Sequence, residues 1–560
     1  MRRLIVTAAA LLIAAGIAAC GSSSPSGSSG SSGAGSGASG TLTMDDETGS
    51  EWNCSFNPFN PSDIGDGVAF GQVYEPLAFV NSLQNAKVTP WLATSWAWSN
   101  GNRTLTFTIR KGVKFSDGTP MTAADVVFTF NMLKKYPAID LNSVWSVLSS
   151  VSQNGDTVAF DFKAPAVPYF YYIADQVAIV PEHIWSKIAN PVTYADANPV
   201  GTGAYVVNPC TPQNITYTPN KYYWQPGEPK IAKVLFPAFT SNDTANTYLT
   251  TGQAQWGAQF IPNINSLYSA KSPDNHYWFP PIANVSLIPN LTLPGLNDVA
   301  VRQAMAYAIN RSQVANVGEY GEENGANQTG VVTPTFSSWK DTAAAAKYGN
   351  DYAYDPAKAK QVLEADGYTL GSDGVFAKDG KRLAFSVINI GGYSDWVADM
   401  SVIQSELKAV GIAITPQNLA QNDDLNDLLT GSFQLAFYDQ TGGPTPEYEL
   451  RQWLFSGNTA PIGKDATTNY ERYSNPATDK LFAEYGQTTS TATQRQIVDE
   501  LQQVMLSQVP FIPVTEESDW FQYNTSGFTG WPTPSDPYAL PAIYQYPDMG
   551  QVLLHLAPKG

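Results

Sequence analysis

The spacing of apolar residues predicts short strands and amphipathic helices along most of the chain. The stretch TLTFTIR at residues 104–110 alternates strictly between apolar residues and threonines, which predicts a half-buried strand. A turn at Asp117-Gly118 precedes a predicted helix, with Thr122 as its N-cap and Asp125 completing a capping box. The apolar stripe expected on this helix consists of Ala123, Val126, Val127 and Phe130.

The same alternation of helix and strand patterns continues in the second half of the chain. A helix is predicted to begin at an Asn297 cap, and another to run from an Asp355 cap to a stop at Gly367. Residues 396–410 form a third periodic segment, followed by a predicted strand at 412–415. Helices and strands that alternate with short connections indicate an α/β fold.

The chain begins with a pattern typical of an export signal. Arg2 and Arg3 precede an apolar run at residues 4–19, which is shorter than the roughly 20 residues of a membrane span. The residues Ile17-Ala18-Ala19 before Cys20 resemble the lipobox of bacterial lipoproteins. That resemblance implies cleavage after residue 19 and acylation of Cys20. The alternative is an ordinary signal peptide followed by a chance cysteine.

Residues 21–40 consist of Gly, Ser and Ala with a single proline, and have no apolar side chains large enough to form a core. We expect a disordered tether that spans roughly 25 Å as a random coil. Such a tether would let a folded body at the membrane surface turn toward a membrane partner.

Composition narrows the functional classes. The net charge of −18 argues against nucleic acid as a partner. No later apolar run is long enough to cross a bilayer. Two cysteines remain besides Cys20, namely Cys54 and Cys210, and in an oxidising compartment they are expected to pair. Two buried thiols are the alternative.

Patterns typical of enzymes are not found in the sequence. The three histidines, His183, His276 and His555, stand far apart, and neither HExxH nor GxSxG occurs. Acidic runs at residues 45–47 and 516–517 lack the spacing of paired catalytic carboxylates and are expected to be solvated. We therefore predict no catalytic residues, no metal and no cofactor, with an exported hydrolase as the rival reading.

Eight segments, in this order, resemble the family 5 extracytoplasmic solute-binding proteins of ABC importers, the dipeptide- and oligopeptide-binding lipoprotein type. They are VYEPLAFVN (73–81), TPWLATSWAWSNGNRTLTFTIRKGVKFSDGTPMTAADVVFTF (89–130), IVPEHIW (179–185), NPVGTGAYVV (198–207), PNKYYWQPGEPKI (219–231), LNDVAVRQAMAYAINR (296–311), YDPAKAKQVLEADGY (354–368) and VPFIPV (509–514).

The resemblance implies an α/β, two-lobed periplasmic-binding-protein-like (type II) fold with an additional α/β domain inserted in lobe I. Two crossing segments would join the lobes. Cys54 and Cys210 would then both lie in lobe I. The implied ranges are 1–19 for the signal peptide, 20–40 for the lipidated cysteine and tether, 41–72, 200–283 and 510–560 for lobe I, 73–199 for the inserted domain, and 284–509 for lobe II.

The function implied by the resemblance is capture of a solute between two hinged lobes and its delivery to an ABC permease. The protein would act as a monomer, extracytoplasmic and lipid-anchored to the outer face of the cell membrane. A solute shifts the lobes toward closure only through its higher affinity for the closed state. A sensor that signals to a membrane receptor would share this sequence pattern.

The resemblance leaves the ligand open. In peptide-binding members an aspartate of lobe II pairs with the ligand's amino terminus, and the matching place lies near Thr441-Gly442-Gly443, where no acid stands. Asp439 and Glu447 are the nearest acids, while glutamines occupy two further positions that are acidic in such members, Gln434 and Gln255. Either Asp439 takes the role, or the ligand is an oligosaccharide or another non-peptide solute.

The residues expected to line the cleft are amides, aromatics and one acid near the expected lobe edges and crossings. For each of them a place in a surface loop or in the core is the alternative. They are Trp52, Asn53, Gln259, Phe260, Asn284, Ser286, Tyr438, Asp439, Gln440 and Thr441.

Overall fold

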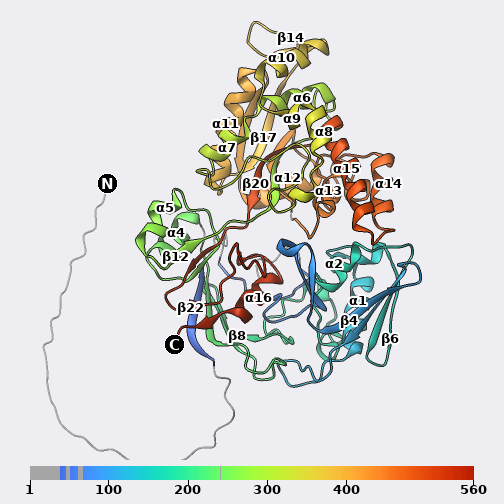
Figure 1. Cartoon of the computed structure of the whole chain (residues 1–560), viewed down its shortest axis with the longest axis vertical. Coiled ribbons are helices and arrows are strands. Elements are labelled where there is room, and N and C mark those ends of the chain that lie inside the picture. Colours follow the sequence, from blue (N-terminus) through green and yellow to red (C-terminus); the bar gives the residue numbers. More distant parts are fainter. Residues whose placement is uncertain (1–37, 46–50, 61–66, 240, 441) are drawn as a thin grey trace, which may run out of the picture. The chain divides into compact units, whose positions relative to one another are not determined.

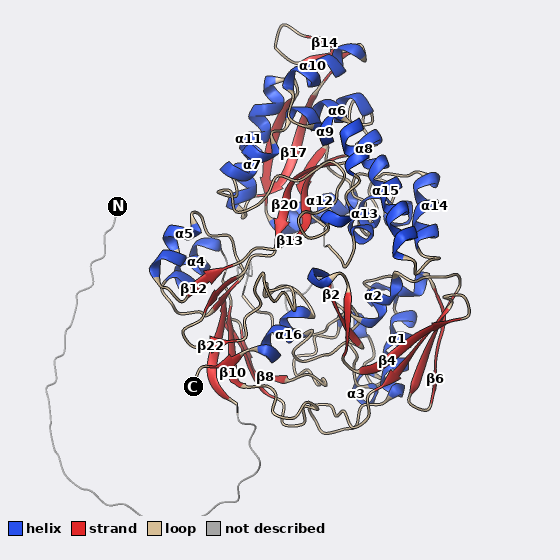
Figure 2. Cartoon of the chain, viewed as in Figure 1, coloured by secondary structure: helices blue, strands red, loops and turns tan. Residues whose placement is uncertain are grey.

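A computed structural model describes residues 38–45, 51–60, 67–239, 241–440 and 442–560. In these ranges the strands form six sheets, and helices alternate with them along the chain, as Figure 2 shows. Cys20 and the signal and tether segments before residue 38 lie outside the described residues, so their predictions stay predictions. No helix in the described ranges is both long enough and apolar enough to cross a membrane.

A seven-stranded sheet has the order β12-β21-β11-β1-β10-β9-β8. Strand β1 pairs in parallel with β10 and β11, and the other neighbours are antiparallel. Its core includes Leu42, Trp256 and Phe521, all fully buried. The strands are β1 (Ser39–Asp45), β8 (Tyr205–Thr211), β9 (Asn214–Pro219), β10 (Ile231–Pro237), β11 (Trp256–Gly257), β12 (Asn275–Tyr277) and β21 (Gln522–Asn524).

Short elements flank this sheet in the sequence. They are α4 (Asn242–Thr250), α5 (Ile264–Leu267), the paired strands β22 (Phe528–Thr529) and β23 (Ala557–Pro558), and α16 (Asp548–His555). Trp256 Nε1 donates to the Pro541 carbonyl at 2.9 Å. This hydrogen bond joins the sheet to the segment that leads to α16.

A four-stranded antiparallel sheet, β4-β5-β7-β6, lies between the first and later strands of the seven-stranded sheet in sequence. Strand β5 has the expected alternation, with Leu105, Phe107 and Ile109 buried. Helix α1 packs on β6 and β7. The elements are β2 (Ala78–Asn81), β3 (Lys87–Pro90), β4 (Ala93–Ser99), β5 (Thr104–Ile109), α1 (Ala123–Lys135), β6 (Leu148–Asn154), β7 (Thr157–Phe162), α2 (Tyr169–Ala174) and α3 (Glu182–Trp185).

A five-stranded sheet has the order β18-β17-β19-β13-β20. Figure 1 shows helices α6, α7, α10 and α11 beside it. The strands are β13 (Pro281–Pro289), β17 (Ala384–Ile390), β18 (Ala413–Leu419), β19 (Leu435–Tyr438) and β20 (Ile512–Ser518), and the helices are α6 (Val299–Ala308), α7 (Arg311–Val317), α10 (Pro356–Ala365) and α11 (Ser394–Ala409).

The remaining elements of this half of the chain are mainly helical. A small three-stranded sheet is the exception. The elements are α8 (Thr342–Lys347), α9 (Gly349–Tyr352), β14 (Thr369–Leu370), β15 (Phe376–Lys378), β16 (Lys381–Arg382), α12 (Gln421–Thr430), α13 (Pro446–Leu454), α14 (Pro476–Tyr485) and α15 (Thr491–Gln508).

Two neighbouring strands carry the chain between the large sheets. β13 and β20 pair antiparallel in the five-stranded sheet, and β20 lies there although its residues fall within the range expected for lobe I. Beyond Pro281 and Ser518, the two segments reach β12 and β21 of the seven-stranded sheet, and Trp278 N donates to the Phe521 carbonyl at 3.0 Å. The fold is therefore the two-lobed α/β type II arrangement, with two crossing segments side by side.

Helix caps test the local predictions. Thr122 and Asp125 form the expected capping box of α1, and Asp355 caps α10. The Asn297 cap is wrong by one residue, because the side chain of Asp298 accepts the hydrogen bond from Ala300 N at 3.0 Å. An aspartate next to an asparagine offers an equally good cap, so composition alone could not choose between them.

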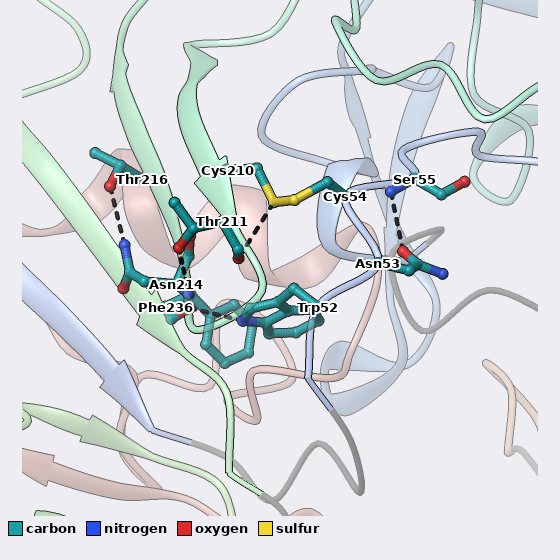
Figure 3. The surroundings of a disulfide bond; sticks show 9 residues. All are labelled: Trp52, Asn53, Cys54, Ser55, Cys210, Thr211, Asn214, Thr216 and Phe236. Carbon is teal, nitrogen blue, oxygen red and sulfur yellow. Dashed lines mark hydrogen bonds between the residues drawn. A yellow bond between two sulfur atoms is a disulfide. The ribbon is translucent and has the colours of Figure 1, made fainter.

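Cys54 and Cys210 are joined by a disulfide, with their Cα atoms 5.8 Å apart (Figure 3). The bond links the loop after β1 to the end of β8. Beside it, Trp52 packs edge-on against Phe236 at 4.9 Å between ring centroids, and its Nε1 donates to the Phe236 carbonyl at 2.9 Å. The disulfide and this buried aromatic pair fix the first loop of the described chain against the seven-stranded sheet.

Candidate functional site

A cavity of about 310 Å³ opens where residues of the two large sheets meet. Most of its wall comes from loops that follow strands or begin helices. Asn242, Ala258, Gln259, Phe260, Trp520 and Tyr544 line it from segments near the seven-stranded sheet. Ile390, Tyr393, Asp395, Trp396, Tyr438, Asp439 and Glu517 line it from the five-stranded sheet and its connections.

Gln259 and Phe260 follow β11, and hydrogen bonds from Gln522 hold the backbone of Gln259 in place. Gln522 accepts from Gln259 N at 3.3 Å and donates to the Gln259 carbonyl at 2.8 Å. The Gln259 side chain is 3 % exposed, and its Nε2 has no hydrogen-bond partner among the described residues. The Gln259 side chain also lowers the pKa of Asp45, which burial raises to about 8, so Asp45 and a ligand acceptor are the two candidate partners of this amide.

Aromatic rings form much of the wall. Trp396, in the first turn of α11, meets Tyr393 edge-on at 5.2 Å and Tyr438 at 6.0 Å between ring centroids. On the part of the wall near the seven-stranded sheet, Phe260 packs edge-on against Trp520, with 5.6 Å between their ring centroids. Rings held in this way present flat apolar faces to a side chain, a sugar ring or a cation.

Three carboxyl groups also line the cavity, while its lining residues include no Lys, Arg or His. Asp395 lies in the first turn of α11, Asp439 directly after β19, and Glu517 on β20. Burial raises the pKa of Asp439 to about 6. Burial, followed by the charges of Glu323 and Asp439, raises the pKa of Glu517 well above its usual value.

More acids stand behind these three. Glu319 and Glu323 follow α7, and Asp399 lies one turn after Asp395 on α11. Burial is the largest cause of the raised pKa of each, and repulsion by Asp395 adds to it. The cavity is therefore rich in carboxyl groups, and burial and their mutual repulsion favour the protonated, neutral form of these acids. Among the described residues, no group of three or more His, Cys, Asp or Glu side chains is arranged to hold a metal ion.

The structure brings four of the residues predicted for the cleft together at this cavity: Gln259, Phe260, Tyr438 and Asp439. Trp52 and Asn53 lie instead beside the disulfide, where Asn53 Oδ1 accepts from Ser55 N at 2.9 Å. Whether any of these residues contacts a ligand stays a prediction.

The other predicted cleft residues lie elsewhere or are not described. Asn284 is buried and donates from Nδ2 to Glu449 Oε1 at 2.8 Å. Ser286 is buried on β13, and Gln440 is buried next to Asp439. Thr441 lies outside the described residues.

Two acidic runs were expected to be solvated, and the described residues contradict this. Asp45 and Glu516 are both fully buried. Glu516 Oε1 accepts from the backbone N and from Oγ1 of Thr333, each at 2.6 Å, while neighbouring Glu517 faces the cavity. Glutamates on a strand alternate sides, and here both sides are covered by protein, which a local charge count cannot reveal.

Asp395, Trp396 and Trp520 were missed at the level of sequence. The signal that could have found the first two is their place in the first helical turn after β17, because ligands of α/β sheets gather at the carboxyl ends of strands. Trp520 directly follows β20, whose role as a crossing segment only the paired structure reveals.

Comparison with known proteins gives consistent matches over most of the chain. Residues 87–461 match the family model described as bacterial extracellular solute-binding proteins, family 5 middle. The nickel-binding periplasmic protein of Escherichia coli (strain K12) is 27% identical over 474 residues, covering 80% of this chain and 85% of the relative.

Solved structures show the same architecture. The periplasmic oligopeptide-binding protein of an oligopeptide ABC transporter from Thermotoga maritima, solved with mannohexaose bound, has a TM-score of 0.83 and 27% identity, covering 93% of this chain and 98% of that one. The oligopeptide-binding protein AppA of Bacillus subtilis, in complex with a nonapeptide, has a TM-score of 0.76 at 20% identity, covering 93% and 99%, which shows the shared fold alone.

Proposed function

Because this chain belongs to family 5 of the bacterial extracellular solute-binding proteins, we propose that its carboxyl-lined cavity captures a peptide-like solute for delivery to an ABC permease. The family consists of binding proteins, and the proposal assigns no covalent chemistry to the cavity. The observation that carries it is the convergence on one cavity of Gln259 from one large sheet and Asp439 from the other.

The chemistry of the wall suits a peptide. Asp395, Asp439 and Glu517 offer acceptors to an ammonium group, and the Nε2 of Gln259 offers a donor to a carbonyl or carboxylate. Trp396 and Phe260 offer apolar faces to side chains. Residues 441–443, where peptide-binding members have the aspartate that pairs with the ligand's amino terminus, include no acid. In this proposal Asp439 takes that role.

Movement between the sheets would follow from the way they are joined. β13 and β20 lead side by side from one large sheet to the other, so rotation about them changes the cavity without breaking either sheet. A solute held by Gln259 and Asp439 together favours the arrangement in which both reach it. Its differential affinity for that arrangement sets how far the equilibrium moves.

An oligosaccharide is the second candidate. The observation that favours it is the Thermotoga maritima protein, which resembles this chain and was solved with mannohexaose bound. Aromatic rings such as Trp396 and Trp520 suit the faces of sugars. The three carboxyl groups favour the peptide, because they can accept hydrogen bonds from an ammonium group, which a neutral sugar lacks.

The test is calorimetric titration of the full chain, extracted with detergent, with tripeptides and with mannohexaose. We expect one tripeptide per chain, and Asp439→Asn to weaken binding by about 2–5 kcal/mol, as for other broken charge pairs. Asp423→Asn, at an exposed position on α12, is the control and should change nothing. X-ray scattering should show compaction on saturation. Binding of mannohexaose with no response to any peptide would overturn the peptide assignment.

We further propose that the protein is held at the outer face of the cell membrane by acyl chains on Cys20, and works there as a monomer. The support is the lipobox-like sequence before Cys20 and the Gly/Ser-rich tether after it. Two chains are needed for stable anchoring, since a single one holds only marginally. Cys20→Ser should release the protein into the soluble fraction and abolish labelling with palmitate. Continued sedimentation with membranes would contradict the anchor.

A further inference from the structure

Beyond the peptide assignment, the cavity has more acidic side chains than one amino terminus requires. Asp395, Asp439 and Glu517 line it, and Glu323 stands directly behind, accepting from Ser518 N at 2.9 Å through Oε1. All of them come from different parts of the five-stranded lobe, namely α11, the end of β19, β20 and the segment after α7. The fold therefore concentrates acids at one place from four separate elements.

Five acids of this lobe have no cationic side chain as an ion-pair partner among the described residues. No lysine, arginine or histidine of the described ranges forms an ion pair with Asp439, Glu517, Glu323, Glu319 or Asp399. Arg311 is the buried arginine nearest in sequence to Glu319 and Glu323. It donates instead to the carbonyl of Pro513 at 2.7 Å and to Gln328 Oε1 at 3.0 Å.

Several polar atoms at the site are buried without partners. Glu319 is 1 % exposed, and its Oε2 receives no hydrogen bond from the described residues. Asp399 is fully buried, and a hydrogen bond with the Glu319 side chain lowers its pKa against the larger effect of burial. On the cavity wall, Gln259 Nε2 makes no hydrogen bond of ordinary geometry with the described residues, although Gln259 lowers the pKa of the buried Asp45 carboxyl through a side-chain hydrogen bond. The wall therefore combines carboxyl acceptors with an amide donor from Gln259.

The rings add to the preference for cations. Phe260, Trp396, Tyr438 and Trp520 line the same cavity as the three acids. An ammonium or guanidinium group gains from the faces of such rings, most when it is desolvated, and from carboxylates nearby. Aromatic faces and carboxylates in one enclosed space suit a cationic side chain better than either an acidic or a neutral polar one.

We propose that the cavity selects solutes with a cationic side chain in addition to a free amino terminus, so that its preferred ligands are short basic peptides. The inference rests on the proposed function and narrows it. Asp439 pairs with the amino terminus, Asp395 and Glu517 with the basic side chain, and Gln259 with a carbonyl.

The test is a matched peptide series titrated into the full chain in detergent. Ala-Lys-Ala, Ala-Gln-Ala and Ala-Glu-Ala differ in charge at one side chain and share the amino terminus. We expect the lysine peptide to bind at least about tenfold more tightly than the glutamine peptide, and the glutamate peptide to bind more weakly still. The advantage of lysine should shrink with rising salt, because it is electrostatic.

Variants separate charge selection from general stability. Glu517→Gln and, separately, Asp395→Asn should each reduce the ratio of lysine-peptide to glutamine-peptide affinity about threefold or more. Glu364→Gln, exposed on α10, is the matched control and should leave the ratio unchanged. Because the readout is a ratio measured on each variant, partial loss of folded protein does not imitate the effect.

The outcomes distinguish this inference from the proposed function. Equal affinity for the lysine and glutamine peptides would overturn cation selection and leave peptide capture standing. Binding of mannohexaose alone would overturn both. Binding of a free diamine such as cadaverine without any peptide would support cation selection and overturn the peptide assignment.

Discussion

The buried contact between Glu449 and Asn284 gives the sharpest test of how this fold uses its acids. Glu449, on α13, is 4 % exposed, and its Oε1 accepts from the backbone N of Asn284 at 3.1 Å and from Asn284 Nδ2 at 2.8 Å. Asn284 lies on β13, one of the two crossing strands. Glu449→Gln keeps an oxygen for both donors and removes only the ability to ionise.

The magnitude follows from the shifted pKa. Burial raises the pKa of Glu449 from 4.5 to about 8, against the opposing hydrogen bonds from Asn284. A raised folded-state pKa contributes stability that is complete below the unfolded pKa and is lost as pH rises toward about 8. At about 1.4 kcal/mol per pKa unit, the wild-type glutamate costs roughly 1 kcal/mol at pH 5 and roughly 5 kcal/mol at pH 9, relative to a neutral group.

The assay is urea unfolding of wild type and Glu449→Gln at pH 5 and pH 9. The variant's advantage in free energy of unfolding should increase by about 4 kcal/mol between the two pH values. Glu500→Gln, exposed on α15, is the control and should show no such increase. A Glu449→Gln advantage that is the same at both pH values would refute the reasoning.

Three further variants, one of them a double substitution, test the packing. Cys54→Ala with Cys210→Ala opens a loop of sequence separation 156 and should lower the free energy of unfolding by up to about 5 kcal/mol in urea titrations, whereas an unchanged value would exclude a stabilising disulfide. Arg302→Lys should lose about 3 kcal/mol, since one ammonium cannot replace three 2.7 Å bonds to the carbonyls of Val509, Leu296 and Gln508. Gly203→Ala would place a Cβ 2.3 Å from the Gln72 carbonyl oxygen and should lower the melting temperature, whereas Gly527→Ala has open space and should not; equal effects would contradict the packing.

The sequence predicts the fold well because its signals are local or shared across a family. The capping box of α1 and the alternation in β5 involve residues within one turn or one strand, and both are confirmed. The family resemblance is confirmed by the match over residues 87–461. The wrong cap predicted for α6 also has a local origin. Asn297 and Asp298 are adjacent residues that can both cap a helix, and only the tertiary position of the chain selects the aspartate.

The site was harder to predict because it is made of residues far apart in sequence. Gln259 and Asp439 were among the predicted residues on the cavity wall, since both directly follow strands near lobe edges. Asp395 and Glu517 were not predicted, because neither local pattern indicates a binding site. Asp395 lies in the first turn of an amphipathic helix, and Glu517 belongs to an acidic pair. Their burial depends on what packs over them, which no local window contains.

The location of Glu517 links the cavity to the connection between the lobes. It lies opposite Ala283 on the crossing pair of strands, between Glu516, which is bound to Thr333, and Ser518, whose backbone donates to Glu323. Three successive residues of β20 therefore face three different environments, and only the middle one faces the cavity. A cation that pairs with Glu517 acts directly on a strand about which the lobes would rotate. Charge neutralisation and lobe movement would then be one event, because the group that needs the ligand's charge is part of the segment that joins the two halves.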